Sequence, residues 1–196
     1  MTNNIPYNKE TDLISQLTQM QKDYYEKTGK NTFFKKSQKV GCAESISNSC
    51  DIDKLIRHSL YIIPNTNKIY MDYLVFKTYA TPQNYVYIAQ QIIILFDKCI
   101  DEYNDYEVHV NLDTLTISGC ERNKNILSVI TEQTLNGKRE YANILNKLYI
   151  YNPPSIMDTV FRIARPYMNP IIMQKVILYS KKDSGLHIHT LFQSMH

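Results

Sequence analysis

Few residues of this chain have the type and spacing that catalysis or metal binding needs. His187 and His189 form its only close histidine pair, but on a helix the two would lie on different faces, and no cysteine or carboxylate accompanies them at ligand spacing. Asp113 stands near the end of a predicted strand, where α/β enzymes often hold catalytic groups, yet no nucleophile or base is identifiable beside it. We therefore interpret the histidines as surface residues and Asp113 as a turn residue, and we predict neither a metal site nor an enzyme.

The sequence motifs of the common cofactor sites are also absent. The five glycines are isolated, so they form neither a Gly-rich phosphate loop nor a G-x-S-x-G nucleophile turn. The four cysteines show no C-x-x-C spacing, and no signal peptide precedes them, which favours packed thiols in a reducing compartment. We predict no cofactor and a cytoplasmic location.

Composition limits the protein to a globular domain with a core of its own. Its 196 residues suit one domain with a modest appendage, and 43% hydrophobic against 21% charged residues excludes a disordered chain. No apolar run approaches the ~18 residues that a membrane span needs. The net charge of +3 is too small to indicate a nucleic-acid partner. Function must therefore be sought in how the elements are arranged.

The N-terminal quarter is patterned differently from the rest of the chain. An apolar stripe that begins at Leu13 recurs at helical spacing and predicts a helix that ends at Thr28. Residues 35–49 carry scattered Ser, Asn and Gly and are predicted to be a linker. We therefore divide the chain into a helical and linker segment over residues 1–54, which is a candidate contact for a protein partner, and a folded domain over residues 55–196.

Beyond residue 55, strand-like and helix-like segments alternate. The predicted strands span residues 70–79, 106–115, 148–151 and 176–180. One predicted helix follows a cap at Asn84, and a terminal helix begins at about Leu186. Between them, helices are predicted over residues 118–131, 141–145 and 155–165. The first and the last of these three begin with the capping boxes Ser118/Glu121 and Ser155/Asp158. This alternation predicts an α/β fold with a mixed, mostly parallel open sheet of about four to five strands flanked by helices.

Residues 148–178, LYIYNPPSIMDTVFRIARPYMNPIIMQKVIL, carry the most specific pattern of the chain. The segment resembles the CRAL–TRIO lipid-binding family, in which a hydrophobic strand, N-x-P, an aromatic-bearing helix, K-P-F-L-x-P and K-I-hydrophobic follow one another. The matching positions are Asn152, Pro154, Phe161, Arg165, Pro166, Tyr167, Met168, Pro170, Lys175 and Val176. Residues 110–115 are similar to the family's strand that ends in D-x-x-G-L, with its glycine replaced by Thr116 or displaced to Gly119.

The resemblance implies an open sheet walled by helices around an apolar pocket, with the helix after Asn152-Pro153-Pro154 as its lid. The residues that it implies for ligand binding or gating are Ile156, Val160, Phe161, Ala164, Tyr167 and Met168. The cations that it implies for headgroup or membrane contact are Arg162, Arg165 and Lys175. A helix this apolar must face a core, a lipid or a membrane, and its pattern alone also suits an ordinary core helix.

The resemblance also bears on which ligand to expect. Phosphatidylinositol-binding relatives carry a glutamate and a threonine at the positions of Asn143 and Ile172, so a headgroup would lose two polar partners here. A different phospholipid, a fatty acid, a sterol or an isoprenoid is as good a candidate for the ligand. The resulting hypothesis is a protein that binds such a ligand in its pocket and touches membranes transiently. Transfer of the ligand between membranes is a further part of this hypothesis. The alternative is a docking module for a small GTPase or a scaffold protein, with the same fold and no bound lipid. A side-chain-filled interior would favour the alternative.

Overall fold

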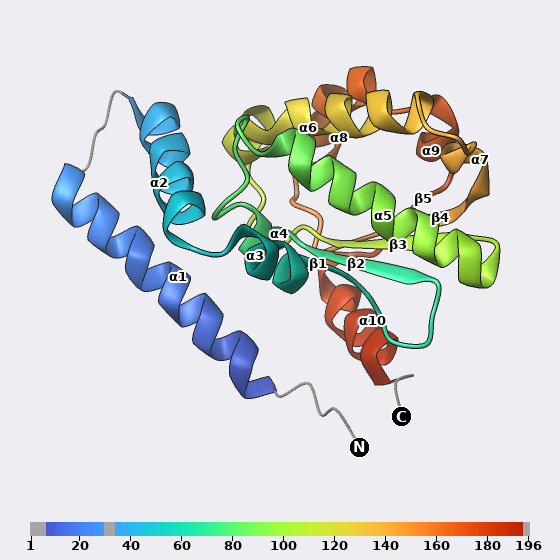
Figure 1. Ribbon diagram of the computed structural model, residues 1–196, viewed down its shortest axis with the longest axis horizontal. Coiled ribbons are helices and arrows are strands. Elements are labelled where there is room, and N and C mark those ends of the chain that lie inside the picture. Colours follow the sequence, from blue (N-terminus) through green and yellow to red (C-terminus); the bar gives the residue numbers. More distant parts are fainter. Residues whose placement is uncertain (1–6, 30–33, 194–196) are drawn as a thin grey trace.

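The computed structural model describes residues 7–29 and 34–193, which fold around one five-stranded sheet (Figure 1). The strands are β1 (Leu60–Ile62), β2 (Lys68–Asp72), β3 (Tyr106–Asn111), β4 (Leu145–Tyr151) and β5 (Val176–Leu178). They lie side by side in chain order, with β1 antiparallel to β2 and every later pair parallel. The predicted α/β class, with a mixed and mostly parallel sheet, is confirmed.

The helices cover the two faces of the sheet unequally. They are α3 (Ile52–Ser59), α4 (Tyr73–Phe76), α5 (Tyr85–Tyr103), α6 (Ile117–Leu135), α7 (Tyr141–Ile144), α8 (Met157–Ala164), the 3₁₀ helix η1 (Arg165–Tyr167), α9 (Pro170–Gln174) and α10 (Lys181–Gln193). Because strand order follows the chain and parallel crossovers are right-handed, the connecting helices fall on one face. α5, α6 and α8 cover this front face, and α10 packs against the back face (Figure 1).

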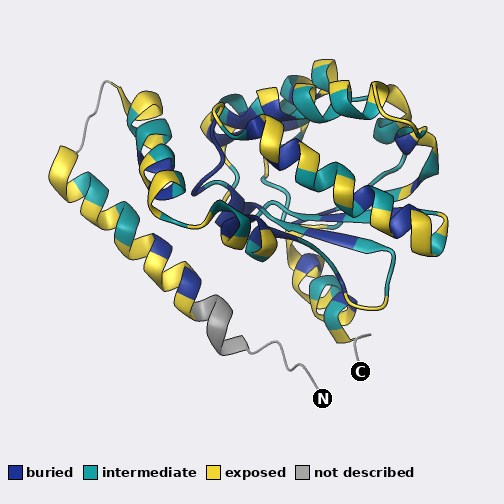
Figure 2. Cartoon of the chain, in the orientation of Figure 1, coloured by how far each residue is buried: buried dark blue, intermediate teal, exposed yellow. Residues whose placement is uncertain are grey.

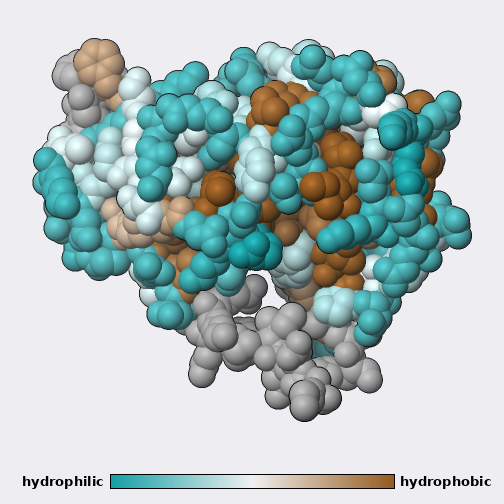
Figure 3. Space-filling model, in the orientation of Figure 1, coloured by the Kyte–Doolittle hydropathy of each residue, from teal (hydrophilic) through white to brown (hydrophobic). Residues whose placement is uncertain are grey.

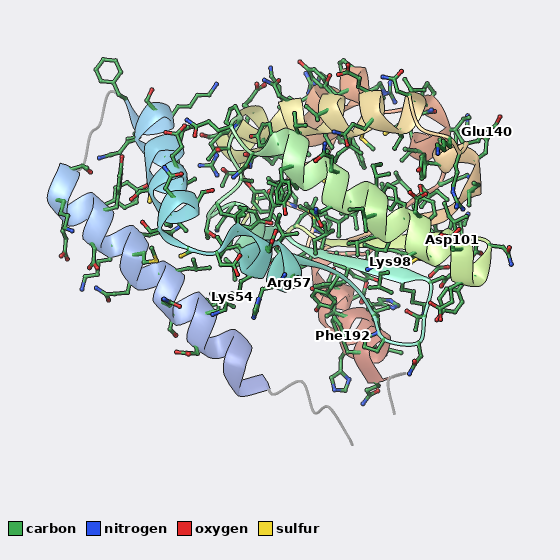
Figure 4. All side chains as sticks on the ribbon, viewed as in Figure 1. Lys54, Arg57, Lys98, Asp101, Glu140 and Phe192 are labelled. Atoms are coloured by element: carbon green, nitrogen blue, oxygen red, sulfur yellow. The ribbon has the colours of Figure 1, made fainter. Side chains whose placement is uncertain are left out.

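The back face of the sheet is a layer of aromatic rings. The strand register aligns Tyr70 of β2, His109 of β3 and Tyr149 of β4 in one row. The rings of His109 and Tyr149 stack with their centroids 4.7 Å apart. Phe192 of α10, which lies under the sheet in Figure 4, meets the ring of Tyr70 edge-on at 5.0 Å. Stacked and edge-on rings at these distances fill the space between β2–β4 and α10.

A polar network runs through this aromatic layer. The Nδ1 atom of His109 lies 2.8 Å from the Tyr151 hydroxyl, and its Nε2 atom lies 3.3 Å from Glu107 Oε2. The hydrogen bond with His109 lowers the pKa of Glu107, although burial acts in the opposite direction. Burial raises the pKa of Tyr151, so its hydroxyl keeps its proton. The back face therefore satisfies its polar groups internally as well as packing its rings.

The N-terminal segment differs from its prediction. α1 (Tyr7–Thr28) ends where the sequence predicts, but residues 35–49, predicted as a linker, form the helix α2 (Lys35–Ser49). α1 and α2 pack side by side, and from residue 12 onward the burial of each is confined to one side (Figure 2). Leu17 and Ile46 join the main hydrophobic core. Because Ser, Asn and Gly interrupt the buried stripe of α2, its helical period is hidden in the sequence.

The predicted strand over residues 70–79 is too long. β2 ends at Asp72, whose carboxylate accepts a hydrogen bond from the Leu74 backbone N–H at 2.7 Å and starts α4. This cap outweighs the β propensity of the aromatic and β-branched residues that follow. The predicted strand over residues 106–115 is also too long, because the chain leaves β3 at Asn111 and reaches φ +65° at Thr114. The short strand β1 was not predicted.

Both predicted capping boxes are wrong. Ser118 and Glu121 lie inside α6, because the extended Thr116 starts the helix earlier and its hydroxyl accepts from the Gly119 N–H at 3.1 Å. α8 begins at Met157 without any side-chain cap from Ser155. A serine near the beginning of a helix therefore does not determine the first helical residue, because the conformation of the preceding backbone also decides it.

The other predicted elements are present with shifted ends. β4 begins at Leu145, β5 ends at Leu178, and α10 begins at Lys181 rather than near Leu186. Asn84 occupies the N-cap position of α5, but its side chain bonds to the loop before the helix instead of capping it. Boundaries of this kind depend on the neighbouring elements more than on local propensity.

Candidate functional site

An apolar cavity of about 300 Å³ lies between the front face of the sheet and the helices above it. Alternate residues of the three middle strands point into it, as the two-residue period of a strand requires. These floor residues are Ile69, Met71, Val108, Val110, Leu148 and Ile150. A smaller apolar cavity of ~150 Å³ can already hold benzene, so this one has room for part of a hydrophobic ligand.

The roof of the cavity is formed by α5, by α6 and by the segment from α8 to α9, which is here called the lid. Of the six residues proposed as gate residues, four line the cavity: Val160, Phe161, Ala164 and Met168. Ile156 precedes α8 and Tyr167 belongs to η1, and neither of them lines the cavity. Met157 lines it and was not among the candidates. Its spacing of three, four and seven residues from Val160, Phe161 and Ala164 could have identified it.

Tyr167 fastens the lid to α6 instead of facing the cavity. Its carbonyl oxygen accepts a hydrogen bond from Thr131 Oγ1 at 2.8 Å. The Nζ atom of Lys124 lies 5.9 Å from the centroid of the Tyr167 ring, which is within cation–π range. Both contacts come from α6, so they hold η1 against the neighbouring roof helix.

The lid is attached to the rest of the protein at both ends. At its start, Asn152 has φ +49°, its backbone N–H donates to Ser184 Oγ at 2.8 Å, and its Nδ2 donates to Asn111 Oδ1 at 2.9 Å. At its end, Lys175 Nζ donates to the carbonyl oxygens of Ala142 at 3.0 Å, Asn143 at 2.7 Å and Leu145. These bonds use the three N–H donors of the Lys175 ammonium within the protein.

The other two candidate headgroup cations lie apart from Lys175. Arg162 and Arg165 are exposed on the outside of the lid, and Arg162 Nη2 donates to Thr159 Oγ1 at 3.3 Å. Ile172 lines the cavity, so the position at which phosphatidylinositol-binding relatives carry a threonine is hydrocarbon here. Lys175 is thus bound by backbone carbonyls, whereas Arg162 and Arg165 are exposed, and Ile172 contributes hydrocarbon to the cavity wall.

The few polar groups of the cavity wall already have partners. Tyr106 donates its hydroxyl hydrogen to the Tyr141 carbonyl oxygen at 2.9 Å, and Asn123 Nδ2 donates to the Tyr73 hydroxyl at 3.4 Å. Burial raises the pKa of Tyr141 to about 12, and burial also raises that of Tyr106, so both phenols stay neutral. Lys124 pairs with the neighbouring Glu121 at 3.0 Å. The wall therefore offers a ligand hydrocarbon above all.

The residues first considered for chemistry lie away from the cavity. His187 was predicted as a plain surface residue, but its ring stacks on Tyr179 with centroids 3.7 Å apart. His189 is exposed, and Asp113 lies in the turn after β3, where it accepts from the Thr114 N–H at 3.0 Å. Within residues 7–29 and 34–193, no cluster of His, Cys, Asp or Glu could hold a metal ion. No helix in the same ranges is long and apolar enough to cross a bilayer.

The comparisons with known proteins agree with this geometry. A family model described as the CRAL/TRIO domain matches residues 48–195, which include the lid and the whole sheet. None of the curated proteins compared with the chain matches it. Proteins of the CRAL/TRIO family bind lipids and other small hydrophobic molecules and in general are not enzymes. The match over most of the chain, together with a mostly parallel sheet under an apolar cavity, shows that this protein belongs to the CRAL/TRIO family.

Proposed function

We propose that the cavity binds the acyl chain of a lipid, or another small hydrophobic molecule, and that the lid admits and releases it. The observation that carries the proposal is the apolar cavity between the front face and the roof, with Phe161 and Val160 of the lid in its wall. Burying an acyl chain gains ~0.8 kcal/mol per methylene, or ~12 kcal/mol gross for about sixteen carbons. A closed cavity captures much more of this free energy than an open groove.

A bilayer is the natural place for the lid to open. Opening exposes the apolar side of α8, which water disfavours and lipid tails accept. Arg162 and Arg165 lie on the outer surface of the same segment, where each could gain ~1 kcal/mol at anionic headgroups. These features support transient binding at a membrane surface, from the cytoplasm, and transfer of the ligand between membranes.

The chemistry of the wall supports a ligand other than phosphatidylinositol. Asn143 and Ile172 stand where the headgroup-binding relatives carry an acid and a threonine, and the Lys175 ammonium is occupied by backbone carbonyls. An inositol ring would therefore meet too few polar partners to offset the cost of its desolvation.

The proposal is tested by identifying what co-purifies with the protein. The full chain is purified under native conditions and extracted with organic solvent, and the extract is analysed by mass spectrometry. We expect one dominant lipid in near-stoichiometric amount. Phe161→Asp places a charge in the cavity wall and should abolish retention while the circular dichroism spectrum is preserved. The matched control is Leu186→Asp, at a side chain that is 70% exposed on α10, and it should retain the lipid.

One surface supports the docking alternative. Val86, Ile93, Ile94 and Val129 line a shallow groove between α5 and α6, and apolar groups are visible on this side of the molecule (Figure 3). If the wild-type extract holds no lipid above background, even after incubation with mixed liposomes, the docking alternative replaces the lipid proposal. Retention of the same lipid by Phe161→Asp would likewise count against the cavity as the site.

A further inference from the structure

Two cations, Lys77 and Arg122, lie close together beside the cavity. Arg122 Nη2 donates to the Lys77 backbone carbonyl at 3.4 Å, and neither side chain forms an ion pair with any residue in the described ranges. The Nε atom of Arg122 is the only buried side-chain nitrogen or oxygen among the described residues that has no hydrogen-bond partner. A buried N–H donor without an acceptor costs free energy, so its persistence calls for an explanation.

Three elements of the fold bring these cations together. Lys77 directly follows α4, and its Nζ donates to Thr114 Oγ1 at 2.6 Å in the loop after β3. Arg122 lies in the second turn of α6, and helical side chains lean toward the N-terminus of their helix, here toward that loop. The place where they meet is at the carboxyl ends of β2 and β3, the edge at which open α/β sheets commonly bind ligands.

Two carboxylates lie near this place and offset part of its charge. Asp72 and Asp113 act on Lys77, but each already accepts a backbone N–H, from Leu74 and Thr114 respectively. Burial lowers the pKa of Lys77, Asp113 and Asp72 act to raise it, and the charges of Arg122 and Lys39 lower it further. Lys77, Arg122 and Lys39 against Asp72 and Asp113 leave an excess of positive charge here, which favours the arrival of an anion.

The surroundings of Arg122 are phenols. Burial raises the pKa of Tyr73 and raises that of Tyr85 to about 12, so both are neutral and cannot serve as its counter-ion. Tyr73 also lines the cavity, and Asn123, the next residue of α6, lines it too. The two cations therefore lie one side chain away from the cavity wall.

We infer that Arg122 and Lys77 form a binding site for a phosphate group. The guanidinium offers a planar fork of N–H donors, including the unused Nε–H, and the ammonium adds a point charge, the pair of donors that phosphate recognition most often uses. The phosphate is either a free ion or the headgroup of a ligand whose chain occupies the cavity. The second source rests on the proposed function, and the first does not.

The first experiment measures thermal unfolding of the full chain as inorganic phosphate is added. Phosphate should raise the unfolding temperature of the wild type. Arg122→Gln and Lys77→Gln should each lower the apparent affinity for phosphate by a factor of about ten or more. Lys181→Gln is the matched control, because it removes one charge from an exposed lysine of α10, and it should respond as the wild type does. In phosphate-free buffer Lys77→Gln should unfold no earlier than the wild type, since one of two like charges is gone.

The second experiment distinguishes the sources of the phosphate. Binding of lysophosphatidic acid is compared with binding of a monoacylglycerol that has the same chain and no phosphate. A preference of about tenfold for the phosphate ester, lost in Arg122→Gln while monoacylglycerol binding is kept, identifies a headgroup site. A response to inorganic phosphate without that preference identifies a free ion.

The outcomes also separate this inference from the proposed function. If the wild type binds phosphate but no monoacylglycerol, the phosphate site stands and the hydrophobic cavity is not a ligand site. The inference is overturned if the wild type shows neither the phosphate response nor the headgroup preference, or if Arg122→Gln shows both as the wild type does.

Discussion

The two faces of the one sheet differ in kind. On the front face, alternate residues such as Ile69, Val110 and Leu148 line the apolar cavity. On the back face, the residues between them, such as Tyr70 and His109, are rings that pack against α10. The same strands thus leave unfilled volume on one side and a filled aromatic layer on the other.

This difference bears on how a small domain can contain a cavity without losing its fold. A cavity forfeits dispersion contacts and costs free energy roughly in proportion to its size. The stacked rings and satisfied polar groups of the back face offset this cost. A ligand that occupied the cavity of the front face would add stability by mass action.

The largest expected effect compares truncation on the two faces. Tyr151→Ala removes a buried ring and a partner of His109, and should lower the free energy of unfolding by about 3 to 5 kcal/mol. Val110→Ala enlarges a space that is already open and should cost only about 1 kcal/mol. Urea denaturation of both variants checks this, and equal losses would remove the distinction between the faces.

The second expected effect compares enlargement on the two faces. Ala164→Phe directs a ring into the cavity, so stability should stay within about 1 kcal/mol of the wild type while binding of a fluorescent fatty acid falls by about tenfold or more. Ser184→Phe places the same ring at a fully buried site of α10 and should cost at least about 2 kcal/mol. A strongly destabilised Ala164→Phe would mean that the front face is filled after all.

A third effect concerns the lid. Thr131→Val removes the hydrogen bond to the Tyr167 carbonyl, worth about 1 kcal/mol, and should speed ligand release about fivefold in stopped-flow displacement. Thr134→Val is the control, because its hydroxyl bonds only to the Thr131 carbonyl within α6 at 2.9 Å. An unchanged release rate in Thr131→Val would show that this bond does not limit opening.

The smallest effect is a pH dependence confined to the back face. The pKa of Glu107 is lowered in the folded state, so its contribution is complete above its unfolded value of 4.5 and is lost as the pH falls below that value. Glu107→Gln should flatten the stability profile between about pH 5 and 3, whereas Asp158→Asn on the exposed side of α8 should not. Ligand binding at the front face should be unaffected by Glu107→Gln at neutral pH.

The sequence reveals the lid more readily than the sites around it. Residues 148–178 follow one another along the chain, so their pattern predicts the strand and the lid helix without tertiary information. The resemblance of the same segment to the CRAL–TRIO family implies that Phe161 lies in the cavity wall. Arg122 and Lys77 are far apart in sequence, and they meet only because β2, β3 and α6 converge at one edge. The helix α2 was missed for a related reason, since Cys42 and Ile46 become a buried stripe only against α1 and the core.

Asn84 and Thr116 show the limit of local rules in another way. Each is a good helix cap by type, and both stand at N-cap positions, yet only Thr116 uses its side chain as a cap. Asn84 instead bonds to the Thr81 N–H and the Tyr79 carbonyl, because the loop before α5 offers partners that the sequence does not show.

The strand order has a consequence for how the protein is made. Because all parallel crossovers fall on the front face, the described cover of the back face is α10, which comes after all five strands. The ribosome therefore releases all five strands before the helix that covers their tyrosines. During that interval the nascent chain exposes an aromatic, aggregation-prone surface. Slow translation ahead of residue 181 should prolong this stage, and a stop codon there should make it permanent. In both cases we expect more aggregation or more binding by chaperones.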